Sequence, residues 1–374
     1  DSSVYTLEHG PWLLTMSIHS RRVKVLTQQL VASTEDVDLD NLAYGFMASS
    51  ALFAALELGI FDALSEKELT VEELAATCQV PQNRLQTLLT ALVASRCLRL
   101  TEGPQPGPGR YRNSPNVQKF MVSSSKAYYG DYLKYQIGRL FYGRMGQLVP
   151  ILRGEEHLNY SSWFSDPSVA STYTQAQHNG SLATAKALFK RVSLKGIQQM
   201  LDVGGGSGAF SLQAVRMGDQ ELKSIVLELP KVCEEGQSLM LAQASEQERR
   251  RISFVELDAT EPSWPIQELS QDLVLMSYLC GSVPEELIEV LYRNALKVLK
   301  PGGRLVVHDF MVDDSKDGPA LGAYWALQHV TVNSNGLGLT PRLVGERLSR
   351  SGFVEVEAFE MIARMTKVVM ARKP

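Results

Sequence analysis

A glycine-rich stretch near the middle of the chain decides the fold, and it reads Met200-Leu201-Asp202-Val203-Gly204-Gly205-Gly206-Ser207-Gly208. The apolar run 200–203 predicts a buried strand, the glycines predict a tight turn, and a helix is expected from Ala209 onward. Glycine suits such a turn because it adopts backbone angles that a Cβ forbids, and because it lets the main chain approach a ligand closely.

Two further strands place acids at the same edge of the predicted sheet. The strand at 223–227 ends in Glu228, and the strand at 252–256 is followed by Asp258. A carboxylate after the second strand can accept hydrogen bonds from both hydroxyls of a ribose. We expect the acid after the third strand to meet the exocyclic amine of an adenine, and Asp202 to bind an amino group.

Other nucleotide-binding loops fit this stretch less well. A P-loop is excluded because no Gly-Lys-Ser/Thr closes the turn, and a dinucleotide loop fits only if Ala209 replaces the last glycine. The order of acid, glycine loop and two further acids resembles the class I S-adenosylmethionine-dependent methyltransferases. The remaining alternative is an α/β domain with a purely structural glycine turn.

Composition indicates an ordinary globular protein of two domains. The chain has 374 residues, is 44% hydrophobic and 21% charged, and carries a formal net charge of −4. This mild negative charge argues against a nucleic-acid or anionic-membrane partner, and no apolar run approaches the ~18 residues that cross a bilayer.

The cysteines lack metal-ligand spacing and predict buried thiols in a reducing compartment, either the cytoplasm or an organelle lumen. They are Cys78, Cys97, Cys233 and Cys280. Since the chain begins with Asp1, we expect it to be a processed or trimmed product, and removal of an N-terminal targeting peptide is one way in which it could arise.

The first part of the chain predicts an extension and a winged helix. Residues 1–36 form the extension, in which 21–31 is interpreted as a short amphipathic packing helix. Residues 37–122 predict helices, with a capping box at Thr70 and Glu73, followed by two short strands. Such domains often bind DNA, so a regulator is an alternative. Since the second helix has few positive charges, dimerisation is the preferred interpretation.

The remaining residues predict connecting helices and an α/β domain. Residues 123–195 are helical, contain a dense cluster of tyrosines, and have a polar break at 175–181. Residues 196–374 alternate strands with helices, which favours a doubly wound, mostly parallel sheet. Ligands of such sheets bind at the carboxyl ends of the strands.

From about residue 40 onward, the chain resembles the acetylserotonin and plant caffeate O-methyltransferase superfamily. The resemblance is carried by 41–47 and 58–62, by the loop 202–208, by Leu229-Pro230, and by later landmarks at 300–303 and 351–353. It implies a Rossmann-like methyltransferase domain with a mostly parallel seven-stranded sheet and an N-terminal winged-helix dimerisation domain. It also implies a homodimer that uses S-adenosylmethionine and releases S-adenosylhomocysteine.

We expect ten residues to bind this cofactor, and five to contact the substrate. The cofactor residues are Asp202, Gly204, Gly205, Gly206, Glu228, Leu229, Asp258, Ala259, Ser277 and Tyr278. The substrate candidates are Tyr129, Tyr135, His178, His308 and Asn333. No metal site is expected.

The chain departs from the superfamily at the catalytic histidine that follows the fourth strand. Gly281 stands at the position of that histidine, and Ser282 stands at that of the next aspartate. Asp309 retains one of the acids that orient the histidine in the superfamily, whereas Leu343 stands where the second acid would be. The sequence therefore predicts that the general base is absent.

The absence of a general base limits which acceptor atoms the enzyme could methylate. A phenol, with a pKa near 10, needs a base at neutral pH, whereas a thioether has no proton to lose. A carbon acceptor loses its proton only after attack. Relatives without the histidine include carbon methyltransferases of bacteriochlorophyll synthesis and S-methyltransferases that act on 4-methylthio-2-hydroxybutyrate in dimethylsulfoniopropionate synthesis. The runs 307–314 and 325–329 are most similar to the latter.

Three classes of function remain open at this point. The first is a small-molecule methyltransferase without a histidine base, acting on a thioether or, alternatively, on the oxygen or carbon of a secondary metabolite. The second is a winged-helix regulator or a non-catalytic cofactor-binding protein. The third is an enzyme that binds the cofactor but performs other chemistry.

Overall fold

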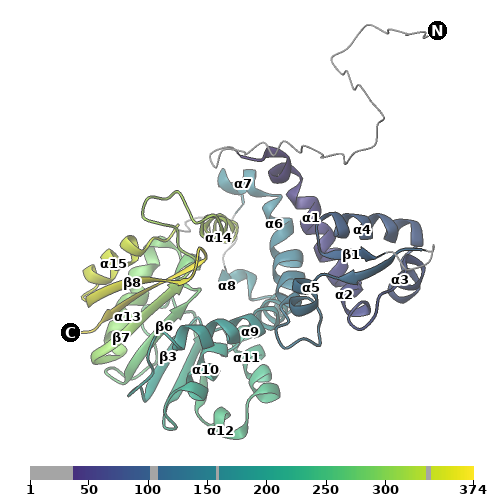
Figure 1. The fold of residues 1–374 in the computed structure, drawn as a ribbon. Helices are drawn as coiled ribbons and strands as arrows, with labels where there is room; N and C mark the ends of the chain where they lie inside the picture. Colours follow the sequence, from purple (N-terminus) through teal and green to yellow (C-terminus); the bar gives the residue numbers. More distant parts are fainter. Residues whose placement is uncertain (1–36, 102–107, 157–159, 334–337) are drawn as a thin grey trace, which may run out of the picture. The chain divides into compact units, whose positions relative to one another are not determined.

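The structure is a computed structural model that describes residues 37–101, 108–156, 160–333 and 338–374. The chain divides into a short unit that ends at Phe46 and a large unit, Met47–Pro374 (Figure 1). The amphipathic helix predicted at 21–31 lies outside the described residues. Within the described ranges, no helix is long and apolar enough to cross a membrane.

The N-terminal elements are helices followed by a two-stranded ribbon, as predicted. They are α1 (Leu39–Glu57), α2 (Ile60–Ala63), α3 (Val71–Cys78), α4 (Gln82–Ala94), β1 (Leu98–Thr101) and β2 (Arg110–Asn113). The capping box is confirmed, because Thr70 Oγ1 accepts from the Glu73 amide and Glu73 accepts from the Thr70 amide. Buried leucines from α3 and α4, including Leu74, Leu85 and Leu89, hold these elements together.

Connecting helices follow, and the longest corrects one prediction. They are α5 (Pro115–Phe120), the π-helix η1 (Tyr132–Phe141), α6 (Tyr142–Met145), α7 (Leu148–Leu152), α8 (Tyr160–Trp163) and α9 (Pro167–Phe189). The predicted polar break at 175–181 is wrong, since α9 runs through it. Its polar side chains find partners on neighbouring elements, as when His178 contacts Ser207 and Gln243 at 2.8 and 3.0 Å.

The C-terminal domain contains the predicted mostly parallel seven-stranded sheet. Its strands are β3 (Gln199–Val203), β4 (Lys223–Glu228), β5 (Ile252–Glu256), β6 (Gln271–Ser277), β7 (Leu299–Asp309), β8 (Val354–Ile362) and β9 (Thr366–Arg372). They lie in the order β5-β4-β3-β6-β7-β9-β8, with only the β9 pairings antiparallel. The order reverses at β3, where β4 lies on one side and β6 on the other. Ligands of open α/β sheets bind at such a reversal.

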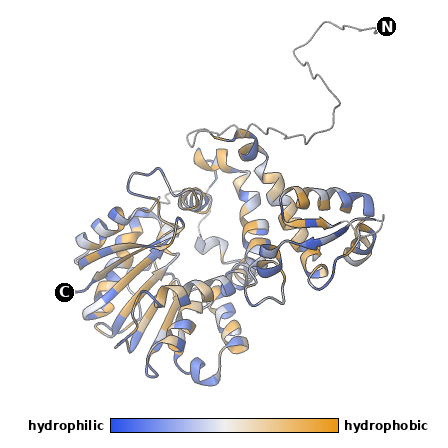
Figure 2. Cartoon of the chain, in the orientation of Figure 1, coloured by the Kyte–Doolittle hydropathy of each residue, from blue (hydrophilic) through white to orange (hydrophobic). Residues whose placement is uncertain are grey.

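Alternating strand residues enter two separate cores, one on each face of the sheet. On one face, Leu201 and Val203 of β3 pack with helices α13 (Ile288–Val298) and α15 (Pro341–Arg350). On the other, Met200 packs with α9 and α10 (Ala209–Met217). Both faces are therefore covered, which explains why hydrophobic colour covers much of the central strands in Figure 2.

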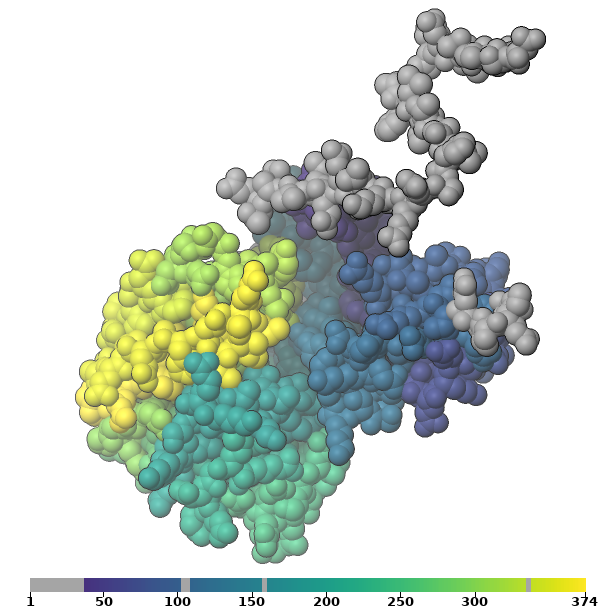
Figure 3. All heavy atoms as spheres, viewed as in Figure 1, coloured from purple at the N-terminus to yellow at the C-terminus, as the bar shows by residue number. Residues whose placement is uncertain are grey.

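Short elements and one exposed edge complete the domain. The remaining elements are α11 (Pro230–Gln243), α12 (Glu246–Arg249), the 3₁₀ turns η2 (Cys280–Ser282) and η3 (Glu285–Leu287), and α14 (Ala320–Val330). The edge strand β8 is mostly exposed, and the C-terminal elements lie at the surface in yellow in Figure 3. Charged residues on that edge, such as Glu355 and Glu357, disfavour pairing with another sheet.

Candidate active site

A cavity of about 400 Å³ lies at the carboxyl ends of β3, β4 and β6, at the point where the strand order reverses. All ten residues predicted to bind the cofactor line it. They come from the ends of neighbouring parallel strands and the loops that follow, so the sheet topology alone brings them together.

The glycine loop packs directly against the first acid. Gly204 has a φ of +64°, and a Cβ there would lie 2.8 Å from Cδ1 of Leu279. A Cβ on Gly205 would lie 2.8 Å from the carboxylate carbon of Asp202. Larger residues would push the loop away from the strand, so both glycines are required for this geometry.

Asp202 is buried with half of its carboxylate unsatisfied. Oδ2 accepts hydrogen bonds from the amide and hydroxyl of Ser211, at 3.2 and 2.9 Å. Oδ1 has no hydrogen-bond partner among the described residues. Burial raises the pKa of Asp202 to about 7, although the Ser211 hydrogen bonds oppose this. A cationic donor in the cavity would satisfy Oδ1 and favour the ionised form.

The other two acids, Glu228 and Asp258, accept hydrogen bonds from neighbouring loop residues and, for Asp258, from α8. Glu228 accepts from the amide of Gly206 at 2.9 Å and from that of Leu229 at 2.7 Å, while burial raises its pKa. Asp258 accepts from the amide and hydroxyl of Thr260 and from the hydroxyl of Ser161. Burial opposes ionisation of Asp258, but these hydrogen bonds outweigh it and lower its pKa.

The described residues that line the cavity include these three acids and no lysine, arginine or histidine. The site therefore attracts a ligand with positive charge. Its aromatic side chains, Tyr160, Phe164, Tyr173, Phe210 and Tyr278, also favour a cation, because aromatic faces attract positive charge by roughly 0.5–2 kcal/mol. Tyr278 has a φ of +57°, a strained conformation of the kind found at functional sites.

The space beside Gly281 is filled by a histidine from another element. A Cβ on Gly281 would lie 2.6 Å from both Cε1 and Nδ1 of His329 on α14, and 3.7 Å from Oδ1 of Asp309. The Gly281 amide donates to Asp309 Oδ2 at 3.1 Å. Burial lowers the pKa of His329 to about 4, so its ring is neutral at pH 7. Sequence reasoning overlooked His329, because no motif links it to the turn at Gly281.

Of the five predicted substrate residues, the structure brings only Asn333 to the cavity. His308 lies below it, with its ring nitrogens 2.9 Å from Ser277 Oγ and 3.0 Å from Thr366 Oγ1.

The other three predicted residues are also absent from the cavity lining and contact neighbouring protein groups. His178 contacts Ser207, which does line the cavity, and Gln243. Tyr129 stacks on Tyr132, and Tyr135 lies against Lys134 and Arg139. Helical spacing did not reveal which face of each helix points to the cavity.

Tyr160 and Gln328, which sequence reasoning did not predict as site residues, meet next to the cavity. The hydroxyl of Tyr160 lies beside Ser282 and the amide of Gln328, and Tyr160 and Ser282 line the cavity whereas Gln328 does not. Burial raises the pKa of Tyr160 to about 12, so it stays protonated and can donate a hydrogen bond. No local signal connects 160 with 328, because only tertiary packing joins them.

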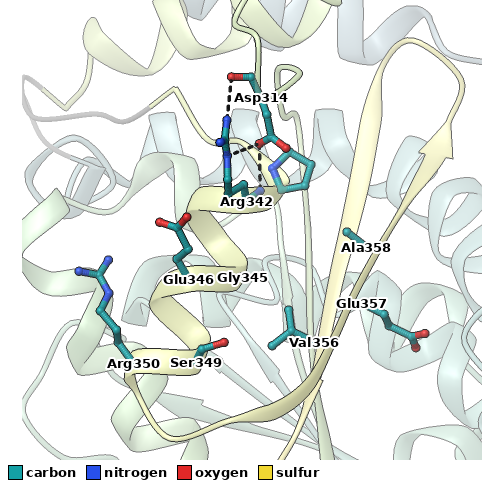
Figure 4. A pocket seen from close by; sticks show the side chains of 10 residues that line it. Asp314, Arg342, Gly345, Glu346, Ser349, Arg350, Val356, Glu357 and Ala358 are labelled. Carbon is teal, nitrogen blue, oxygen red and sulfur yellow. Dashed lines mark hydrogen bonds and ion pairs between the residues drawn. The ribbon is translucent and has the colours of Figure 1, made fainter.

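A second, open groove of about 680 Å³ lies between α15 and β8 (Figure 4). Asp314 and Arg342 pair across one end of it, so its best-placed charges already satisfy each other. It contains none of the unpaired buried polar atoms found in the described residues. Among those residues, no group of three or more His, Cys, Asp or Glu is arranged to hold a metal ion.

Comparison with known protein families agrees with this geometry. An O-methyltransferase domain model matches residues 153–354, and an O-methyltransferase dimerisation domain model matches residues 40–123. The chain belongs to the O-methyltransferase family. The predictions of a methyltransferase, of S-adenosylmethionine as its cofactor and of this two-domain fold are thereby confirmed.

The relatives of this O-methyltransferase family member are named for methylation of different atoms, oxygen in one case and carbon in another. The chain is 26% identical to human (Homo sapiens) acetylserotonin O-methyltransferase over 350 residues, which covers 90% of this chain and 97% of that protein. It is 27% identical to bacteriochlorophyllide d C-20 methyltransferase of Chlorobaculum tepidum over 289 residues, 73% of this chain and 78% of the relative. The crystal structure of human N-acetylserotonin methyltransferase with SAM aligns with a TM-score of 0.79 at 24% identity, covering 91% of this chain and 99% of that one.

The contact between Gly281 and His329 makes a testable prediction. Gly281→Ala should lower the free energy of unfolding by about 1–3 kcal/mol, because its Cβ would overlap the His329 ring. Adding His329→Ala should remove most of that penalty, since the ring that clashes is gone. Thermal melts of the two single variants and the double variant measure the coupling. Simple additivity of the two single effects would contradict the packing described here.

Proposed function

We propose that this enzyme transfers a methyl group from S-adenosylmethionine to the sulfur of a small thioether, such as 4-methylthio-2-hydroxybutyrate. One observation carries the proposal: the described lining of the cavity contains no histidine, cysteine or lysine that could take a proton from an acceptor. Tyrosines cannot serve as bases there, since burial raises the pKa values of Tyr160, Tyr173 and Tyr278.

The three acids would hold the cofactor, which supplies an electrophilic methyl group on a sulfonium. In this proposal Oδ1 of Asp202 would accept from the amino group, Glu228 from the ribose hydroxyls and Asp258 from the adenine amine. The cradle formed by Gly204 and Gly205 would admit the main chain close to this ligand, and the tyrosine and phenylalanine faces would surround the sulfonium.

Transfer to a thioether balances without a proton. The acceptor sulfur donates a lone pair to the methyl carbon as the donor carbon–sulfur bond breaks, which yields a new sulfonium and neutral S-adenosylhomocysteine. The task of the protein is then to align the two sulfur atoms and exclude water. Its acidic, aromatic cavity suits an acceptor that gains positive charge.

A second candidate is methylation of a hydroxyl, and the position of His329 favours it. Its ring fills the space beside Gly281 where the family's histidine would project, and Asp309 lies nearby. If the acceptor were an oxygen acid, His329 would take the proton as the new bond forms. Because the pKa of His329 is about 4, it would be a weak base.

The two candidate functions predict different methylated products and different effects of replacing His329. We expect mass spectrometry to detect a methylated thioether, with a maximal rate that does not change between about pH 6 and pH 9 because no group loses a proton. His329→Asn should reduce turnover of the thioether less than about tenfold.

Methylation of phenols alone, with a loss of ~10²–10⁴ in His329→Asn, would overturn the thioether proposal in favour of the oxygen acceptor. The matched control is His308→Asn. His308 is buried below the cavity, so its replacement should lower stability without changing which acceptor is used.

We also propose that the enzyme is a homodimer. The dimerisation domain model begins at residue 40, within α1. On that helix Leu39, Leu42 and Tyr44 are 67%, 63% and 59% exposed. A cluster of large apolar side chains on one surface helix is typical of an interface.

Light scattering should therefore show a dimer at micromolar concentration, and Leu42→Glu should weaken it by at least about tenfold, because a charge would enter the interface. Leu241→Glu is the matched control, since Leu241 on α11 is 68% exposed and lies outside the matched dimerisation domain. A monomeric wild type, or equal effects of both variants, would contradict the proposal.

A further inference from the structure

Gln328, near the end of α14, has a buried amide that the protein leaves unsatisfied. Its side chain is 6% exposed, and neither Oε1 nor Nε2 has a hydrogen-bond partner among the described residues. The Tyr160 hydroxyl is close, but the pair does not meet the geometry of a hydrogen bond. Leaving a buried polar group unpaired costs about 1–3 kcal/mol, and a ligand would remove that cost.

Neighbouring groups connect this amide to the cavity. Tyr160 and Ser282, which lie beside one another near Gln328, both line it. Asn333, just beyond the end of α14, lines it as well and donates from Nδ2 to the Ser282 carbonyl at 3.1 Å. Tyr160, Ser282 and Asn333 thus form one part of the cavity wall, and Gln328 on α14 lies behind them, next to Tyr160.

The chemistry of the cluster selects the group that it would bind. The amide of Gln328 offers one acceptor and one donor group, both unpaired, and this pair matches a hydroxyl, which also accepts and donates. A carboxylate only accepts, and the nearby Asp309 would repel it when ionised. An ammonium only donates and would leave the amide nitrogen unpaired.

We propose that Gln328, supported by Tyr160 and Asn333, binds a hydroxyl group of the acceptor and so determines which thioethers are methylated. This inference rests on the proposed function for the acceptor sulfur, and it adds the group that the enzyme recognises away from that atom. A site built to bond a hydroxyl strongly rejects analogues that lack it.

The test compares two acceptors that differ only in the hydroxyl, 4-methylthio-2-hydroxybutyrate and 4-methylthiobutyrate. We expect the wild type to prefer the hydroxylated acceptor by at least about tenfold in kcat/KM. Gln328→Met keeps the length of the side chain but removes its polar atoms. It should abolish this preference mainly by raising KM for the hydroxylated acceptor.

Stability supplies a readout that separates binding from structure. Because Gln328→Met removes an unsatisfied amide, its melting temperature without ligands should equal or exceed that of the wild type. The matched control is Gln271→Met, which removes another buried, unpaired amide oxygen at the start of β6. It should leave the acceptor preference unchanged.

A binding measurement keeps this inference separate from the thioether proposal. In the presence of S-adenosylhomocysteine, 2-hydroxybutyrate should bind the wild type more tightly than butyrate, and Gln328→Met should lose the difference. If that result holds while no thioether is methylated, the acceptor atom is wrong but the hydroxyl site stands. Equal preferences in wild type and Gln328→Met, by turnover or by binding, would overturn the hydroxyl site.

Discussion

Uncompensated negative charge is the constraint on which the site depends. Asp202, Glu228 and Asp258 converge on one cavity whose described lining contains no basic residue. Burial raises the pKa values of Asp202 and Glu228, so ionising these carboxylates in the protein costs free energy. The strand order brings the three acids together. A ligand with positive charge would lower these pKa values, so under the proposed function cofactor binding and protonation are linked.

A second constraint is space around the turn after β6. Gly281 has no side chain because His329 already occupies the volume above it, so the two positions behave as one packing unit. In this chain the imidazole beside the turn comes from α14, and Asp309 lies near the same turn. The proposed acceptor site depends on the same part of the fold, because Gln328 and His329 lie on α14 and Asn333 lies just beyond it.

Sequence reasoning predicted the parts of the site that local order determines. The residues predicted to bind the cofactor lie at the ends of strands or in the loops that follow. Because parallel strands end at the same edge, Glu228 and Asp258 could be placed beside one cavity without coordinates. The residues that would contact the methyl acceptor were harder to predict from the sequence. Tyr135 and His178 have plausible spacing, yet the helix faces on which they lie turn toward protein partners. The meeting of Tyr160 with Gln328 depends on tertiary packing, which no short motif encodes.

Proton release on cofactor binding tests the central electrostatic claim most directly. Calorimetric titration with S-adenosylhomocysteine at about pH 6.5, in buffers that differ in ionisation enthalpy, counts the protons exchanged. Without ligand, the pKa of Asp202 is about 7, so its carboxyl group is mostly protonated at about pH 6.5. An ammonium group bound beside it would lower this pKa, and we therefore predict net release of about half a proton or more. Asp202→Asn should abolish most of that release. Binding by the wild type with no proton release would contradict the claim that the cofactor's charge is met by this buried carboxylate.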